Sequence, residues 1–144
     1  FDWVHSADSA KLLEALDRHA AEAGRSLRAL VQVNVSGERS KSGLAPAAVP
    51  EVLALAHRLR NVQIVGLMTI PPLAEDPETA RPCFRKLREL RGEWAAATGL
   101  ELPELSMGMT HDLDVAIEEG ATFVRVGTGI FGARARPAEG AEEA

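Results

Sequence analysis

Five short apolar segments alternate along this chain with longer segments whose apolar residues recur at helical spacing. The apolar segments predict strands over residues 3–6, 30–35 and 62–70, a short strand around Leu105, and a last strand over 121–126. Strands that alternate with helices are typical of a parallel sheet, because each parallel connection needs a crossover that a helix provides. The pattern therefore predicts an α/β fold of parallel strands with covering helices.

Helix boundaries are marked by capping residues, glycine and proline. Asp8 or Ser9 can cap the first helix, and Gly24 is suited to end it. Asp76 is followed by a proline, which is the order expected at a helix start, and Thr110 is expected to cap the last helix. The buried faces predicted for two of the helices comprise Leu12, Leu13, Leu16, Ala20 and Ala23, and Ala80, Phe84, Leu87, Leu90 and Trp94.

Composition excludes several classes of protein. The chain has 144 residues, 46% hydrophobic and 26% charged, which suits one globular domain with a real core. A net charge of −5 argues against a broad nucleic-acid surface, and no apolar run approaches membrane-spanning length. Cys83 is the only cysteine, and no histidine and cysteine spacing resembles a metal site, so no metal is expected. A cytosolic location is predicted.

Five strand–helix units fit either a small open, doubly wound sheet or part of a (β/α)8 barrel. The doubly wound fold places its glycine-rich phosphate loop after the first strand, whereas barrel phosphate sites follow the seventh and eighth strands. The glycine-rich loops here follow the last two strands, which favours an incomplete TIM-type barrel, about strands 4 to 8. The barrel portion is predicted to span residues 1–134. The acidic segment 135–144 is predicted to be a disordered tail.

Two strand-to-helix loops carry the small and hydroxyl residues that suit a phosphate. The first contains Ser106 and Gly108, and the second contains Gly127, Thr128 and Gly129. Hydroxyls donate hydrogen bonds, and glycine lets backbone N–H groups approach an anion closely. One such loop alone reads as an ordinary turn. Two on neighbouring parallel strands favour an anion site.

Other polar residues at strand ends have both a structural and a functional interpretation. Arg125, inside an apolar strand, can pair with a buried carboxylate or donate to a ring held between the loops, and its position favours the second role. His5 and Ser6 end the first strand, where helix capping is the simpler explanation. Asn34 ends the second strand and can line a pocket, while Met68, at the end of the third, more often packs than binds.

Three further charged residues have simpler explanations. Lys41 lies in a loop on the face where barrels bind ligands, but an ordinary loop charge is the safer interpretation. Asp112 and Asp114 suit the positive end of the last helix dipole.

Four runs carry a family resemblance: VHSADSAKLLEAL, VQVNVSGERSKSGL, GLMTIPP and LSMGMTHDLDVAIEEGATFVRVGTGIFGAR. Through them the chain, from about Val4 to Arg134, resembles the pyridoxal-phosphate homeostasis proteins, barrels related to the N-terminal domain of bacterial alanine racemase. The resemblance implies a (β/α)8-type barrel that binds pyridoxal 5′-phosphate (PLP). It also implies a protein that buffers the cofactor or delivers it to PLP-dependent apoenzymes, rather than an enzyme.

The resemblance further implies roles for individual residues. Ser106, Gly127 and Thr128 would hold the phosphate, and Arg125 would face the pyridine nitrogen. A cationic donor disfavours protonation of that nitrogen and weakens the ring as an electron sink, which suits racemisation or no chemistry. The pocket would be shaped by Met107, Gly108 and Gly129, and the ring lined by His5, Ser6, Asn34 and Met68.

The chain departs from the family at the covalent contact. Members form a Schiff base with PLP through a lysine at the end of the first barrel strand, and none of Lys11, Lys41 and Lys86 matches that position. We therefore expect the C-terminal part of such a barrel, with the phosphate half of the site. The alternative function is a PLP-dependent amino-acid racemase of the same barrel type. Such racemases usually use a tyrosine base, and this chain has no tyrosine.

Association is expected to depend on how much of the barrel is present. A complete barrel is expected to be a monomer. Five strands with open edges are expected to self-associate. Part of the reason is that core residues such as Val31, Val33, Ile64 and Val65 would be exposed without the other strands.

Overall fold

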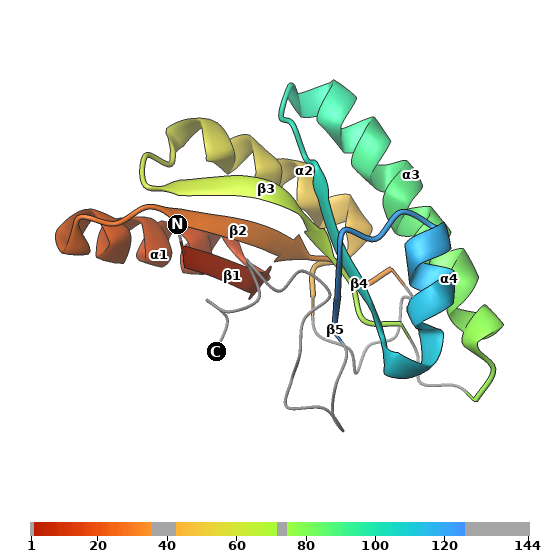
Figure 1. Ribbon diagram of the computed structural model, residues 1–144. Coiled ribbons are helices and arrows are strands. Elements are labelled where there is room, and N and C mark those ends of the chain that lie inside the picture. The colour runs from red at the N-terminus through yellow and green to blue at the C-terminus, as the bar shows by residue number, and fades with distance from the viewer. Residues whose placement is uncertain (1, 36–42, 72–74, 126–144) are drawn as a thin grey trace.

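The computed structural model describes residues 2–35, 43–71 and 75–125 (Figure 1). For Asp2, His5 and Arg125 only the backbone is described. The predicted tail over 135–144 lies outside the described residues, as does the second of the two predicted phosphate loops.

Five strands form a single sheet in which every strand pairs with its neighbour in sequence (Figure 1). All four pairings are parallel. The strands are β1 (Asp2–Ala7), β2 (Leu27–Gln32), β3 (Val62–Met68), β4 (Glu104–Met109) and β5 (Phe123–Arg125). The order β1-β2-β3-β4-β5 confirms the predicted parallel α/β arrangement.

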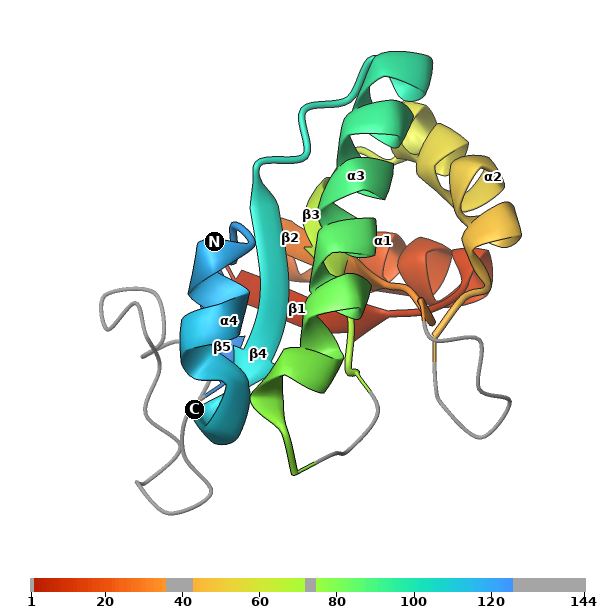
Figure 2. The same cartoon turned by 90° about the vertical axis from the view of Figure 1, so that its right-hand side faces the viewer.

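Helices connect the strands and cover the outer face of the curved sheet (Figure 2). Ser9 caps the first helix by accepting the Leu12 N–H at 3.1 Å, and Gly24 ends it with φ 67°. Both boundaries agree with the sequence-based prediction. The helices are α1 (Ala10–Ala23), α2 (Val49–Ala54), α3 (Arg81–Thr98) and α4 (Leu113–Glu118), with 3₁₀ turns η1 (Pro46–Ala48), η2 (Leu55–Arg58), η3 (Pro77–Ala80) and η4 (Thr110–Asp112).

The sheet is strongly curved, as a contact between aromatic side chains of its two outermost strands shows. In a flat sheet β1 and β5 would lie about 19 Å apart, four strand spacings of about 4.8 Å each. The rings of Trp3 in β1 and Phe123 in β5 nevertheless meet edge to face, with centroids 5.0 Å apart and an interplanar angle of 66°. The two outermost strands therefore curl toward each other around a shared interior, which is the predicted incomplete barrel.

The two faces of the sheet have separate apolar clusters. The larger one joins the outward-facing strand residues, such as Val31, Leu67 and Leu105, to the buried stripes of the four helices. A smaller cluster on the concave face contains Leu30, Val65 and Met68, with Trp3 packed against it. Strand β3 is thus apolar on both faces, as its sequence predicts.

The predicted exposure of core residues is wrong. Val31, Val33, Ile64 and Val65 are between 0% and 7% exposed. Three of them lie in the larger cluster, where the chain's own helices cover them. Self-association through the open edges stays a prediction, but it has no support from these four side chains.

Two details of the predicted elements are also wrong. The second strand runs from Leu27 to Gln32 rather than over 30–35, because its pairing with β3 already begins at Leu27 and Val62. Leu12 is 37% exposed and Ala23 is exposed, so the buried stripe of α1 is narrower than predicted. The stripe of α3, from Ala80 to Trp94, is buried as predicted.

Thr110 does not cap the last helix. Strand β4 continues to Met109, and the chain enters the helix through η4. The carboxylate of Asp112 turns back and accepts the Met109 N–H, which leaves Thr110 as an exposed first residue of the turn. A carboxylate is the stronger acceptor near a helix N-terminus. Over the described residues, no helix combines the length and apolarity needed to cross a membrane.

Candidate functional site

A row of four paired residues crosses the concave face, from the last residues of β2 and β3 to the interior of β4 and the start of β5. Gln32 pairs with Met68, Met68 with Ser106, and Ser106 with Phe123. Paired residues on neighbouring parallel strands point to the same face of a sheet. All four are at most 5% exposed. The row is a mixed apolar and polar wall on the inside of the half-barrel, and it brings together two of the predicted site residues, Met68 and Ser106.

Ser106 is the polar centre of this wall. Its side chain is 0% exposed, and its Oγ has no hydrogen-bond partner among the described residues. The backbone around it is fixed, since the Ser106 carbonyl accepts the Thr69 N–H at 3.1 Å and the Thr69 hydroxyl donates to the Val33 carbonyl at 2.8 Å. An unpartnered buried hydroxyl costs stability, and this one lies in a rigid frame inside β4. These features are typical of a ligand contact.

The turn after Ser106 is built by close contact with α4. Gly108 has φ +103°, and a Cβ at this position would lie only 2.5 Å from Ala116 Cβ. The next residue, Met109, donates its N–H to Asp112 Oδ1 at 2.6 Å. Gly108 is therefore needed for packing and backbone conformation, while its predicted close approach to an anion stays a prediction.

This geometry limits what the first loop offers an anion. The Met109 N–H is already bonded to a carboxylate, so it does not point at a phosphate. The carboxylate also occupies the N-terminal end of the helix that follows, where an anion would otherwise be favoured. Ser106 and Gly108 lie inside β4 rather than in a loop, because the strand continues to Met109, so the predicted position of the first loop is wrong. What this part of β4 offers an anion is the Ser106 hydroxyl.

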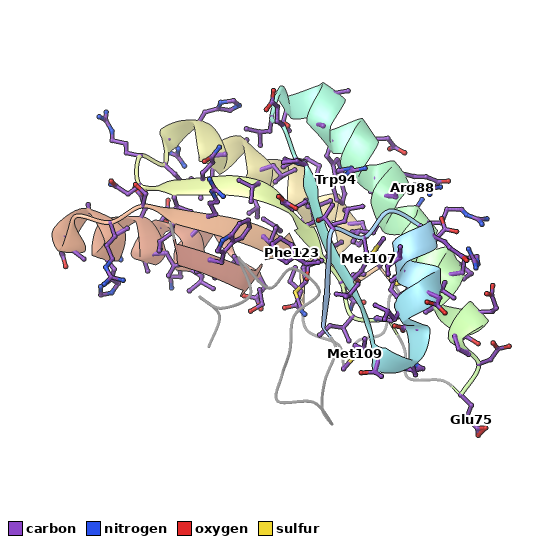
Figure 3. The ribbon with its side chains drawn as sticks, in the orientation of Figure 1. Glu75, Arg88, Trp94, Met107, Met109 and Phe123 are labelled. Carbon is purple, nitrogen blue, oxygen red and sulfur yellow. The ribbon has the colours of Figure 1, made fainter. Side chains whose placement is uncertain are left out.

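The remaining predicted residues fall into different places. Met107 points to the other face of the sheet, into the core with the helices, and is 1% exposed (Figure 3). Asn34 follows β2, is half-buried, and donates its backbone N–H to Leu44. Ser6 is exposed in β1. His5 and Arg125 lie in β1 and β5, and the backbone of Arg125 pairs with Met109 at the same end of the sheet as the row.

Several predicted residues lie outside the described residues. These are Gly127, Thr128, Gly129 and Lys41. Lys11 and Lys86 are exposed on α1 and α3. Within the described ranges, no three His, Cys, Asp or Glu side chains are grouped as metal ligands would be.

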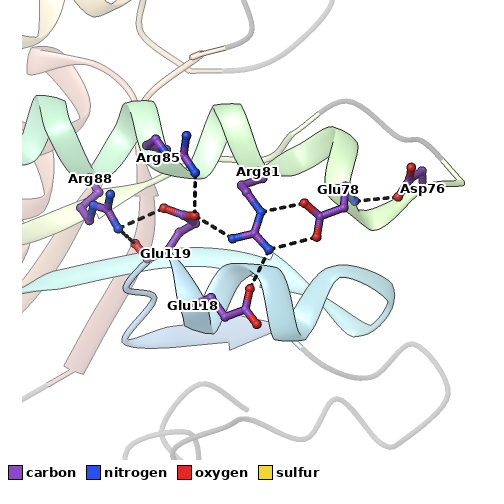
Figure 4. A network of polar contacts seen from close by, with 7 residues as sticks. All are labelled: Asp76, Glu78, Arg81, Arg85, Arg88, Glu118 and Glu119. Atoms are coloured by element: carbon purple, nitrogen blue, oxygen red, sulfur yellow. Dashed lines mark hydrogen bonds and ion pairs between the residues drawn. The ribbon is translucent and has the colours of Figure 1, made fainter.

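A polar network joins α3 to the end of α4, away from the row (Figure 4). Arg81 donates to Glu78 at 2.7 Å, to Glu119 at 2.8 Å and to Glu118 at 2.6 Å. Arg88 Nη1 lies 3.0 Å from Glu119 Oε1 as an ion pair and donates to the Glu119 carbonyl at 3.5 Å. Figure 4 shows that the arginines of α3 converge on the Glu119 carboxylate.

The charges of this network stabilise one another. The Arg81 hydrogen bond, with further contributions from Arg85 and Arg88, holds the pKa of Glu119 below its ordinary value of 4.5, against the opposing effect of burial. The carboxylates, Glu78 first, raise the pKa of Arg81. Glu119 is 6% exposed, whereas Arg81, Arg85 and Arg88 are 25% to 53% exposed, so solvent screens part of the interaction. The network has the character of a structural clamp.

A cavity of about 470 Å³ lies at the opposite end of the sheet from the row. Leu27 and Val62, which begin β2 and β3, line it together with loop residues such as Arg60 and Glu101. It contains none of the predicted site residues. In barrels the amino ends of the strands contribute stability rather than chemistry, so the row at the carboxyl ends is the better candidate site.

Sequence reasoning missed Gln32, Phe123 and the role of Asp112. Gln32 was read as an ordinary strand residue, yet it is 5% exposed in the wall. No local pattern places Gln32 there, because its position depends on the pairing of β2 with β3. Phe123 and Asp112 depend on the curvature of the sheet and on the turn after β4, which no local pattern reveals.

The fold and the wall define the class of protein as a parallel α/β half-barrel of the TIM type whose strand ends form a buried polar site. The chain belongs to the alanine racemase N-terminal domain family, since the sequence model of this family matches residues 1–135.

The chain is similar to proteins known from several bacteria. It is 48% identical over 131 residues to the pyridoxal phosphate homeostasis protein of Aquifex aeolicus strain VF5, a match covering 91% of this chain and 58% of that protein. PipY of Synechococcus elongatus PCC7942, solved without PLP, superposes with a TM-score of 0.84 at 43% identity, over 92% of this chain and 62% of PipY. PipY with PLP bound gives 0.81 at 41% identity, over 92% and 61%. The chain thus spans about three fifths of the relatives it matches.

Proposed function

We propose that this protein binds PLP and takes part in its intracellular homeostasis, holding the cofactor for buffering or delivery to apoenzymes in the cytosol rather than turning over a substrate. The buried, unpartnered hydroxyl of Ser106 carries this proposal, because it lies in the wall that faces the interior of the half-barrel. The similar proteins support it, since they are named pyridoxal phosphate homeostasis proteins and PipY has been solved with PLP bound.

The residues of the wall fit such a cofactor. A phosphorylated aromatic ring needs hydrogen-bond donors at one end and apolar contacts along its faces. Ser106 supplies a hydroxyl that no described residue uses, and Met68 supplies an apolar surface beside it. We propose that the Ser106 hydroxyl holds the phosphate together with Gly127 and Thr128, with Gly129, Gly108 and Met107 supporting the loops. In the same proposal Arg125 faces the pyridine nitrogen, and His5, Ser6, Asn34 and Met68 line the ring.

The test is a PLP titration followed by fluorescence, with Ser106→Ala as the decisive variant. Loss of a hydrogen bond to a charged phosphate should raise the Kd about tenfold or more. Ser26→Ala is the matched control, since Ser26 lies at the far cavity and its variant should bind as wild type. Binding that is not saturable, or that is unaffected by Ser106→Ala, would contradict the proposal.

A second experiment separates a cofactor holder from an enzyme and locates any covalent contact. PLP addition, borohydride reduction and peptide mapping would be run on this chain and on an upstream-extended version where the reading frame provides one. The proposal expects a stable lysine adduct in the extended version, no specific label on Lys41 in this chain, and no racemisation of alanine by either. Specific labelling of Lys41 or measurable racemisation would show that the site is used differently.

A further inference from the structure

One buried carboxylate at the end of β4 has no part in the proposed contacts with PLP. Asp112 is 1% exposed. Its Oδ1 accepts the Met109 N–H at 2.6 Å, which is short for a hydrogen bond of this type. Its Oδ2 lies 3.9 Å from His111 Nε2 and has no hydrogen-bond partner among the described residues. Keeping a carboxylate in such a place is costly, so its interaction with the turn must be worth that cost.

The carboxylate and α4 together determine the path of the backbone after Ser106. Met109 is extended, with φ −134° and ψ −169°. Its N–H donates to the Asp112 carboxylate, and its side chain accepts from the Asp112 N–H. Gly108 is held against Ala116 with no room for a Cβ. The turn that follows β4 is therefore fixed by a hydrogen bond on one side and by close packing on the other.

We propose that Asp112 is a positioning residue of the PLP site, an inference that rests on the proposed function. It fixes the turn after β4, and this turn holds the end of the strand so that the Ser106 hydroxyl remains directed to the interior. It also closes the N-terminal end of the following helix to anions, because it consumes the Met109 N–H and places a negative charge there. The phosphate is thereby directed to the Ser106 hydroxyl.

Three variants test this role. Asp112→Ala removes the acceptor, Asp112→Asn keeps an acceptor oxygen in the same place, and Asp114→Ala removes an exposed carboxylate two residues away. Each is measured for PLP affinity by fluorescence, for the 31P shift of added PLP, and for exchange of the Met109 amide proton. We expect Asp112→Ala to raise the Kd about tenfold, shift the 31P resonance and expose the Met109 amide, as loss of a bond to a charged group predicts.

The other two variants separate positioning from a purely structural role. Asp112→Asn should bind PLP within about threefold of wild type, because the carbonyl oxygen of asparagine can accept the same N–H. Asp114→Ala should match wild type in all three measurements. A substitution that only destabilised the folded protein would leave the 31P shift of the bound PLP unchanged.

The outcomes distinguish this inference from the proposed function. If wild type does not bind PLP, the proposed function fails. If wild type binds and Asp112→Ala binds equally well with a freed Met109 amide, the function stands and the positioning role is overturned. If Asp112→Ala does not fold, Asp112→Asn decides, since a tenfold loss in this variant would overturn the role and wild-type binding would support it.

Discussion

The two ends of α4 differ in how their buried polar groups are compensated. Where the helix ends, Glu119 is 6% exposed, and its Oε1 makes no hydrogen bond but lies 3.0 Å from Arg88 as an ion pair. Its Oε2 is paired with Arg81 and Arg85. Where β4 leads into it, Ser106 and Asp112 are 0% and 1% exposed, and each leaves one oxygen without a hydrogen-bond partner among the described residues. Both ends belong to the same strand–helix unit and pack against the same core.

This difference distinguishes polar groups that stabilise the fold from polar groups that remain available to a ligand. Buried polar groups in proteins are normally satisfied, and leaving one unsatisfied costs about 1–3 kcal/mol. A unit selected for stability alone would resemble the Glu119 end throughout. The buried oxygens that lack an arginine partner are instead Ser106 Oγ, inside β4, and Asp112 Oδ2, just after the carboxyl end of β4, the end at which barrels bind their ligands. Substitutions at each end of α4 test this difference.

Gly108→Ala should have the largest effect on stability, about 3 kcal/mol. The new Cβ would lie 2.5 Å from Ala116 Cβ and would adopt φ +103°, so steric overlap and backbone strain add. Urea unfolding measures the loss. Gly24→Ala is the matched control, because Gly24 has φ +67° but nothing within 4 Å, and strain alone should cost about 1 kcal/mol.

A double variant sharpens this prediction. Ala116→Gly removes the atom that the new Cβ meets, so Gly108→Ala with Ala116→Gly should recover part of the loss despite the cost of glycine in a helix, about 1 kcal/mol. Equal losses for Gly108→Ala and Gly24→Ala would mean that the close contact with α4 is unimportant.

Glu119→Gln should cost about 2 kcal/mol, between the values for exposed and fully buried ion pairs. It leaves the arginines of α3 facing a neutral group in a site with little solvent. The neighbouring Glu118 is 60% exposed and bonds the same Arg81, so Glu118→Gln should cost less than about 0.5 kcal/mol. Urea unfolding of the two variants at neutral pH checks the contrast, and equal costs would contradict it.

The same pair of variants predicts a pH dependence. The pKa of Glu119 is held below its ordinary value of 4.5, so its ionised form stabilises the folded state above that pH. This contribution is lost as the pH falls through the folded-state pKa. The stability difference between wild type and Glu119→Gln should therefore be constant near neutral pH and shrink as the pH falls below 4.5. A difference that grows on acidification would mean that the carboxylate is not stabilised by its arginines.

Local patterns in the sequence predict most of the fold. The alternation of segments gives five parallel strands, and capping residues such as Ser9 give helix boundaries, because these signals act over a few residues. The failures have tertiary causes. Leu12 is exposed because the width of the stripe depends on how α1 sits against the sheet. Thr110 loses its capping role to Asp112, since the length of β4 decides where the helix starts.

The candidate site was only partly accessible from the sequence. Ser106 and Gly108 stand out because small and hydroxyl residues beside an apolar segment suit a phosphate. The family resemblance added Met68 and Met107, although alternation along β4 turns Met107 into the core. Gln32 joins the wall through pairing with a strand thirty residues further on, and the meeting of Trp3 with Phe123 requires the curvature of the whole sheet. A short sequence segment does not reveal such long-range pairings and contacts.

The smallest predicted effect tests the comparison most directly. Thr69 and Ser106 are both 0% exposed, but the Thr69 hydroxyl donates to the Val33 carbonyl at 2.8 Å while the Ser106 hydroxyl has no partner among the described residues. Without PLP, Thr69→Val should cost about 1.5 kcal/mol. Ser106→Ala should leave stability unchanged or raise it by about 0.5–1 kcal/mol, because it removes an unsatisfied group. Urea unfolding of both variants decides. If Ser106→Ala costs as much as Thr69→Val, its hydroxyl has a structural partner and is no longer available to bind a phosphate.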